Sequence, residues 1–119
     1  MYKDTEKDTF LRRLRKRNKH SMWQSSYFGW HGVRGVYCVC TGGLNYETLE
    51  IEKLKVWYVG SSGNVGTRLN NLKHPYRILW GKGFQPFIRY AETEDYKKLE
   101  KRIISLLSPP MNKQYNRHR

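Results

Sequence analysis

Apolar and aromatic residues of this chain gather in short runs that polar and glycine-rich stretches separate. Residues 33–41 and 55–60 are rich in valine, tyrosine and tryptophan, a composition typical of β-strands. Residues 84–91 predict a third strand, and Pro86 favours an edge position because proline cannot donate to a strand ladder. The Gly-Gly pair after the first run opens an acidic segment that we interpret as an extended hairpin or a loop insertion.

Helical spacing of apolar residues appears in two later segments. Within residues 63–72, apolar residues recur at i, i+4 and i+7, which predicts a short helix. In the last segment, apolar residues fill one continuous arc of a helix that Thr93 would cap and Pro109–Pro110 would end. These elements predict an α+β fold, in which a small three-stranded antiparallel sheet is flanked by helices.

The N-terminal segment has a different character. Residues 5–20 have a helical pattern, but their apolar stripe is too thin to hold a helix firmly. We therefore divide the chain into a basic, aromatic-rich arm, residues 1–32, and one folded domain, residues 33–119. The basic residues of the arm that we expect to contact nucleic acid are Arg12, Arg13, Arg15, Lys16 and Arg17.

The length and the net charge of the chain limit the functions that it can have. The 119 residues suffice for one modest core, and the net charge of +13 predicts a polyanionic partner. Nucleic acid is the commonest polyanion, and we include Lys73 and Arg77 among its expected contacts; an anionic membrane or an acidic protein is the alternative. Without an apolar run long enough for a membrane span or a secretory signal, we expect a cytoplasmic protein that is not secreted.

The two cysteines, Cys38 and Cys40, alternate along a predicted strand and should point to the same face. A disulfide between them is geometrically poor, and four zinc ligands cannot be assembled around them. We interpret both as small buried residues of a protein in a reducing compartment.

Glu100 is a carboxylate on the apolar arc of the last helix, between Tyr96, Ile103 and Leu107. A carboxylate in that position is costly unless it meets a cation. One interpretation is an ion pair with an arginine, for which Arg68 is the candidate; the other is a metal ligand. No acidic residue occurs between Lys53 and Ala91 or after Glu100, so this carboxylate is flanked by basic sequence.

Five features in this order resemble the motifs of the GIY-YIG nuclease family, and the likeness extends over residues 33–116. The features are the triplet Gly35-Val36-Tyr37, the triplet Tyr58-Val59-Gly60, Arg68, Glu100 and Asn112. Either triplet alone would be a weak signal, whereas five features with the right order form a specific one. Valine replaces the isoleucine of both triplets. Tyr58 follows Tyr37 by 21 positions, about twice the usual spacing, so an insertion must bulge away from the site.

The resemblance implies a role for each motif residue. Glu100 would hold a single Mg²⁺ or Mn²⁺, and Tyr37 would be the general base beside the attacking water. Tyr58 would orient the water or the phosphate, and Arg68 would stabilise charge on the phosphate. Asn112 would tie the chain after the last helix to the active-site strands. Many members also have a histidine near the first helix, for which His74 and His31 are weaker candidates.

The function that follows is a metal-dependent DNA endonuclease, and RNA stays open as a second substrate. No separate DNA-reading domain is evident, so we expect recognition to be weak in sequence, or to depend on DNA structure, on a dimer or on an accessory protein. The resemblance to a small stand-alone member of the family would suit a phage or mobile element. Two alternatives remain: a catalytically silent nucleic-acid-binding module that keeps the fold, and a basic protein that grips another protein.

Overall fold

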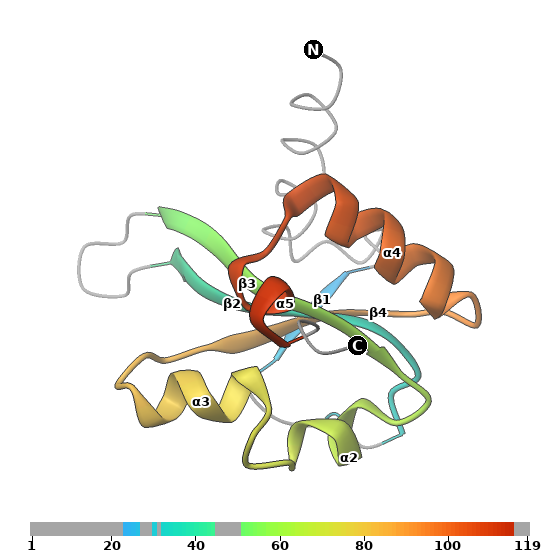
Figure 1. Ribbon diagram of the computed structural model, residues 1–119, viewed down its shortest axis with the longest axis horizontal. Coiled ribbons are helices and arrows are strands. Elements are labelled where there is room, and N and C mark those ends of the chain that lie inside the picture. Colours follow the sequence, from blue (N-terminus) through green and yellow to red (C-terminus); the bar gives the residue numbers. More distant parts are fainter. Residues whose placement is uncertain (1–22, 27–29, 31, 45–50, 116–119) are drawn as a thin grey trace.

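The computed structural model describes residues 23–26, 30, 32–44 and 51–115 (Figure 1). The predicted helical arm and its five basic residues therefore lie outside the described ranges. In the part that the structure describes, no helix has the length and apolar character needed to cross a membrane.

An antiparallel sheet forms the centre of the molecule. Its strands are β1 (Gln24–Ser26), β2 (Gly35–Leu44), β3 (Ile51–Ser62) and β4 (Phe87–Glu92), in the order β1-β4-β2-β3. The three predicted strands and their antiparallel arrangement are confirmed, and the short β1 is an addition that the sequence did not reveal.

The predicted edge position of the third strand and the predicted boundary between arm and domain at residue 33 both need correction. β4 is not an edge strand, since it pairs with β1 on one side and β2 on the other. Pro86 is buried just before the first residue of β4, so it removes no ladder hydrogen bond there. β1 and the buried Trp23 and Trp30 also precede residue 33, so part of the segment that we assigned to the arm contributes to the folded body.

Helices cover both faces of the sheet (Figure 1). α2 (Val65–Leu69) and α3 (Pro75–Gly81) lie on one face, and α4 (Tyr96–Leu107) lies on the other. α5 (Pro110–Tyr115) follows α4 directly. The sequence predicted α2 and α4 but neither α3 nor α5, both of which are short and begin with a proline.

The ends of α4 show which capping signals operate. Thr93 is not its N-cap: the helix begins after Asp95, and Thr93 Oγ1 instead accepts a hydrogen bond from the Asp95 amide at 3.3 Å. At the other end, Ser108 adopts the left-handed conformation with φ 46° and Pro110 starts α5, as the predicted proline stop requires.

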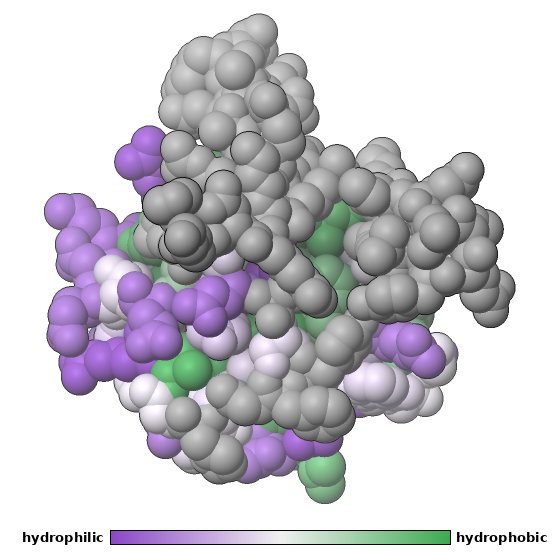
Figure 2. Space-filling model, turned by 180° about the vertical axis from the view of Figure 1, so that it is seen from behind, coloured by the Kyte–Doolittle hydropathy of each residue, from purple (hydrophilic) through white to green (hydrophobic). Residues whose placement is uncertain are grey.

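Exposed basic residues cover the outer side of α4, and Figure 2 shows hydrophilic side chains gathered along that flank. They are Lys97, Lys98, Lys101 and Arg102.

Alternation along β2 divides the apolar residues into two cores. Val36, Cys38 and Cys40 pack on the α4 side with Ile103, while Tyr37 and Val39 pack on the other side. Both thiols are free and buried, as the sequence predicts, and burial raises the pKa of Cys40 to about 12.

The long spacing between the two tyrosine motifs is accommodated by a hairpin. β2 and β3 remain paired as far as Leu44 and Ile51, so the predicted extended hairpin is confirmed. A β-bulge interrupts this ladder, because Val39 pairs with Tyr58 and the next residue, Cys40, pairs with Val56. Trp57 is the extra residue, and it packs with the same core as Tyr58.

Gly60 is the position where the sheet tolerates no side chain. A Cβ atom there would lie 2.5 Å from the Tyr37 hydroxyl oxygen and 2.6 Å from its ring carbon Cζ. Because the Tyr37 side chain is fully buried, it has no room to retreat.

We therefore expect Gly60→Ala to lower the free energy of unfolding by about 1–3 kcal/mol, the usual cost of overpacking. Gly81→Ala is the matched control, because a Cβ atom at the end of α3 meets nothing within 4 Å. That variant should be neutral or slightly stabilising, since alanine favours a helix. Urea unfolding of both variants measures the difference; equal stabilities would contradict the steric role of Gly60.

Candidate active site

The candidate site is built around four consecutive residues of β3, Tyr58 to Ser61, on the edge strand of the sheet. Tyr58 itself belongs to the predicted set, and the next three residues each contact one further group. Val59 bonds to Asn112, Gly60 lies under the Tyr37 hydroxyl, and Ser61 bonds to Glu100. The structure thus brings these predicted residues to one stretch of backbone.

Tyr37 reaches this edge from β2, on the face covered by α2 and α3. Its hydroxyl oxygen lies 2.7 Å from His74 Nε2, and its ring centroid lies 6.2 Å from that of Tyr58. The His74 ring stands edge-on to Tyr58 at 5.3 Å. His74, a weaker candidate from the sequence, is therefore in direct contact with the proposed general base.

The hydrogen bonds of His74 determine its tautomer. It caps the N-terminus of α3, where its Nδ1 accepts a hydrogen bond from the Tyr76 amide at 3.1 Å. Nδ1 therefore carries no proton, so the proton of the neutral ring is on Nε2. Nε2–H then donates to the Tyr37 hydroxyl oxygen, and His74 cannot take the Tyr37 proton at that atom.

Burial keeps His74 neutral. The pKa of His74 is lowered from 6.5 to about 4, mainly by burial and next by the positive charges of Arg68 and Arg77. Because the neutral ring still donates through Nε2, this hydrogen bond favours the phenolate form of Tyr37 without adding a charge to the core.

The pKa of Tyr37 is raised above 10, mainly by burial and next by the negative charge that Tyr58 can carry. Arg68 opposes this effect through its charge and a side-chain hydrogen bond, whereas the charge of Glu100 adds to it. Tyr37 is consequently a neutral phenol near pH 7. Cancelling the charge of Glu100 would move its pKa down.

Glu100 approaches the same edge from α4, on the opposite face. Ser61 Oγ donates a hydrogen bond to Glu100 Oε1 at 2.7 Å, and the glutamate side chain is half-buried. Arg68, the arginine that we expected to pair with this carboxylate, belongs to α2, where its charge and a side-chain hydrogen bond act on Tyr37. Its pairing with Glu100 stays a prediction.

Asn112 holds the backbone of the edge strand. Its Oδ1 accepts a hydrogen bond from the Val59 amide at 2.7 Å, and its Nδ2 donates to the Val59 carbonyl at 2.8 Å. Both bonds are buried, so α5 satisfies backbone groups that an edge strand would otherwise leave unpaired. This contact ties the chain after α4 to the strand of Tyr58, as the resemblance implies.

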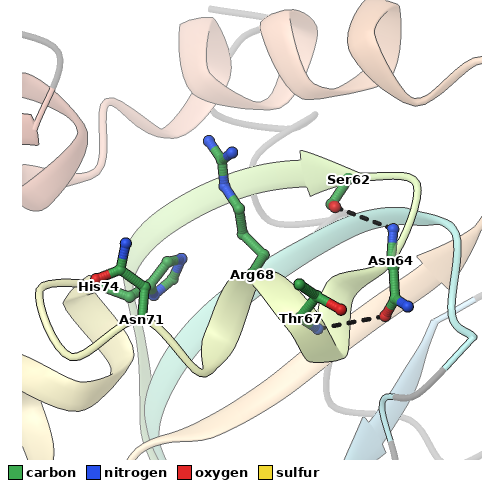
Figure 3. Close-up of a pocket in the computed structure, with 6 residues that line it drawn as sticks. All are labelled: Ser62, Asn64, Thr67, Arg68, Asn71 and His74. Carbon is green, nitrogen blue, oxygen red and sulfur yellow. Dashed lines mark hydrogen bonds between the residues drawn. The ribbon is translucent and has the colours of Figure 1, made fainter.

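A cleft of about 360 Å³ opens beside this cluster (Figure 3). In Figure 3, Arg68 projects from α2 between His74 on one side and Ser62 on the other. The lining residues are Ser62, Asn64, Thr67, Arg68, Asn71 and His74. Five of the six are uncharged and polar, and Arg68 supplies the positive charge that an anionic group entering the cleft would meet.

The other predicted residues lie apart from this cluster or beyond the described part. His31 is outside the described residues. Lys73 is exposed, whereas Arg77 also has a structural role, since its Nε donates to the Leu69 carbonyl at 3.0 Å and links α3 to α2. Sequence reasoning missed Ser61, because a serine beside a glycine carries no signal until the glutamate opposite it is known.

The residues present fit a singly ligated cation. Within the described ranges, no three His, Cys, Asp or Glu side chains gather into a metal-binding group. Glu100 would therefore be the protein carboxylate at such a site, with Ser61 fixing one of its oxygens. Mg²⁺ suits this arrangement because it usually keeps several waters and takes one or two carboxylates together with substrate phosphate.

Comparison of the chain with protein families and with curated proteins finds no match, and comparison with solved structures finds none.

The titration of His74 predicts a pH dependence of stability. Between pH 6.5 and about 4 the unfolded chain binds a proton that the folded protein excludes, so the free energy of unfolding falls as the pH falls. The expected loss is on the order of 3 kcal/mol, at about 1.4 kcal/mol per pKa unit.

His74→Asn tests this prediction, because asparagine keeps an N-cap for α3 but does not titrate. Denaturant unfolding at several pH values should give a shallower acid slope for the variant than for the wild type. Parallel slopes would contradict the buried neutral histidine.

Proposed function

We propose that this protein is a metal-dependent endonuclease that hydrolyses phosphodiester bonds of DNA through an active site of the GIY-YIG type. The observation that carries the proposal is the convergence of Tyr37, Glu100 and Asn112 on the Tyr58–Ser61 segment. Tyr37 comes from β2, whereas Glu100 and Asn112 come from the consecutive helices α4 and α5, far from β2 in the sequence. Packing alone does not require two tyrosines, an arginine and a glutamate at one edge of a sheet.

The chain's own groups suggest how they would act on a phosphodiester. Arg68 would contact a non-bridging phosphate oxygen, where positive charge stabilises the pentacovalent transition state. Tyr37, once its proton has passed to solvent, would accept a proton from the attacking water. His74 Nε2–H and Arg68 both donate toward the Tyr37 oxygen and so favour its anionic form.

Glu100, oriented by Ser61, would hold the divalent cation, and Mg²⁺ or Mn²⁺ bound there would supply Lewis-acid stabilisation of the phosphate and acidify a water. The net charge of +13 supports an extended anionic substrate.

A catalytically silent nucleic-acid-binding module is the second candidate, and one observation favours it. The raised pKa of Tyr37 keeps the phenol protonated in the metal-free protein, which describes a packed core residue equally well. Cleavage separates the candidates, because the module would have no cleavage to lose.

The first test is Glu100→Gln on supercoiled plasmid with Mg²⁺ or Mn²⁺. We expect nicking or linearisation by the wild type, a loss of at least a hundredfold in the variant, and unchanged DNA affinity, because a neutral amide binds the cation poorly. Glu94→Gln is the matched control, since Glu94 is an exposed acid that pairs with Arg34. Absence of cleavage by both the wild type and the variant would contradict the nuclease proposal.

The second test is Ser61→Ala. Removing the hydroxyl that fixes Glu100 Oε1 should lower the cleavage rate about tenfold and raise the Mg²⁺ concentration that gives half-maximal cleavage. Ser105→Ala, which changes an exposed serine of α4, is the control and should behave as the wild type. A Mg²⁺ dependence that Ser61→Ala leaves unchanged would show that this serine does not orient the metal ligand.

A further inference from the structure

An aromatic surface lies next to the candidate site, and the proposed catalytic roles leave it unused. It consists of Trp57 on β3 and Phe84 in the segment between α3 and β4, whose ring centroids are 5.4 Å apart. Lys55 lies beside them, with its Nζ 3.9 Å from the Trp57 ring centroid. We call Lys55, Trp57 and Phe84 the Trp57–Phe84 platform.

Two features hold the platform in place. The β-bulge brings Trp57 to the Tyr58 side of the strand, and Trp57 Nε1 donates to Thr41 Oγ1 at 2.9 Å, which fixes the indole orientation. Phe84 keeps 41% of its surface exposed and Trp57 is half-buried. Exposed phenylalanine beside a fixed indole offers flat apolar area at little entropic cost.

The charge around the platform indicates its occupant. Between Lys53 and Ala91, the stretch that supplies the whole platform, the chain has basic residues and no acidic one. Lys55 and Lys82 are exposed within this stretch. An apolar protein partner would not require charge of one sign, whereas a nucleic-acid strand offers both flat bases and phosphates.

We propose that the Trp57–Phe84 platform stacks an unpaired base of the DNA strand beside the bond to be cleaved. Lys55 then exchanges its contact with the indole for a neighbouring phosphate. The inference rests on the proposed function and specifies its substrate class: DNA with unpaired nucleotides next to the scissile phosphate. Trp57 directly precedes Tyr58, and the Tyr58 ring centroid lies 5.3 Å from that of His74, which lines the cleft. A base on the platform would therefore belong to a nucleotide near the cleft.

Equilibrium binding of the full chain in EDTA tests this inference without cleavage. The probes are a labelled DNA duplex and the same duplex with a short unpaired loop, compared at one salt concentration. We expect the wild type to prefer the looped duplex, and Phe84→Ala to weaken that complex about tenfold while leaving the fully paired complex unchanged.

Two further variants keep the test specific. Trp57→Phe retains an aromatic face and should keep most of the preference. Leu72→Ala removes an apolar side chain that is 82% exposed but lies outside the platform, and it should keep all of the preference.

The proposed stacking would be overturned if the wild type bound the two probes with equal affinity. It would also be overturned if Phe84→Ala and Leu72→Ala lost equal affinity for the looped duplex. A change in oligomeric state on Phe84→Ala with unchanged DNA binding would overturn it as well, because the surface would then join two copies of the chain. Since EDTA prevents cleavage, failure here leaves the nuclease proposal to the Glu100→Gln test. A retained preference without Mg²⁺-dependent cleavage would instead overturn the nuclease proposal alone.

Discussion

The close contact between the Tyr37 hydroxyl and the backbone of Gly60 is the constraint on which the candidate site depends. Tyr37 starts on β2, inside the sheet, and only the missing side chain at Gly60 lets its hydroxyl lie over the edge strand. There it meets His74 from α3 and the influence of Arg68 from α2. A side chain at Gly60 would push the phenol back and separate these groups.

The edge position of β3 explains how one site draws on both faces of the sheet. Successive side chains of a strand point to opposite faces, so Gly60 meets Tyr37 on one side while Ser61 meets Glu100 on the other. At a central strand the neighbouring backbone would separate the two groups. In the described sheet β3 is the edge strand, and Asn112 satisfies the backbone amide and carbonyl of Val59 there.

Opposing electrostatic effects act on the Tyr37 hydroxyl. Burial, Tyr58 and Glu100 all oppose ionisation of Tyr37, and Arg68 opposes them in turn. His74 contributes a neutral donor, since its own burial prevents it from carrying a charge. A cation at Glu100 would cancel the negative charge that helps to raise the pKa of Tyr37, so the two faces of the edge strand would be electrostatically linked.

The sequence by itself determined the main strands, the amphipathic α4 and the motif residues, because each has a local signal in periodicity, composition or order. It also indicated that Glu100 is unusual, since one carboxylate on an apolar arc is visible without a structure. The partner of Glu100, the central place of β4, the tautomer of His74 and the bulge at Trp57 were decided only by the tertiary structure. Each of these depends on which distant segment lies opposite, and residue spacing along one segment carries no information about that.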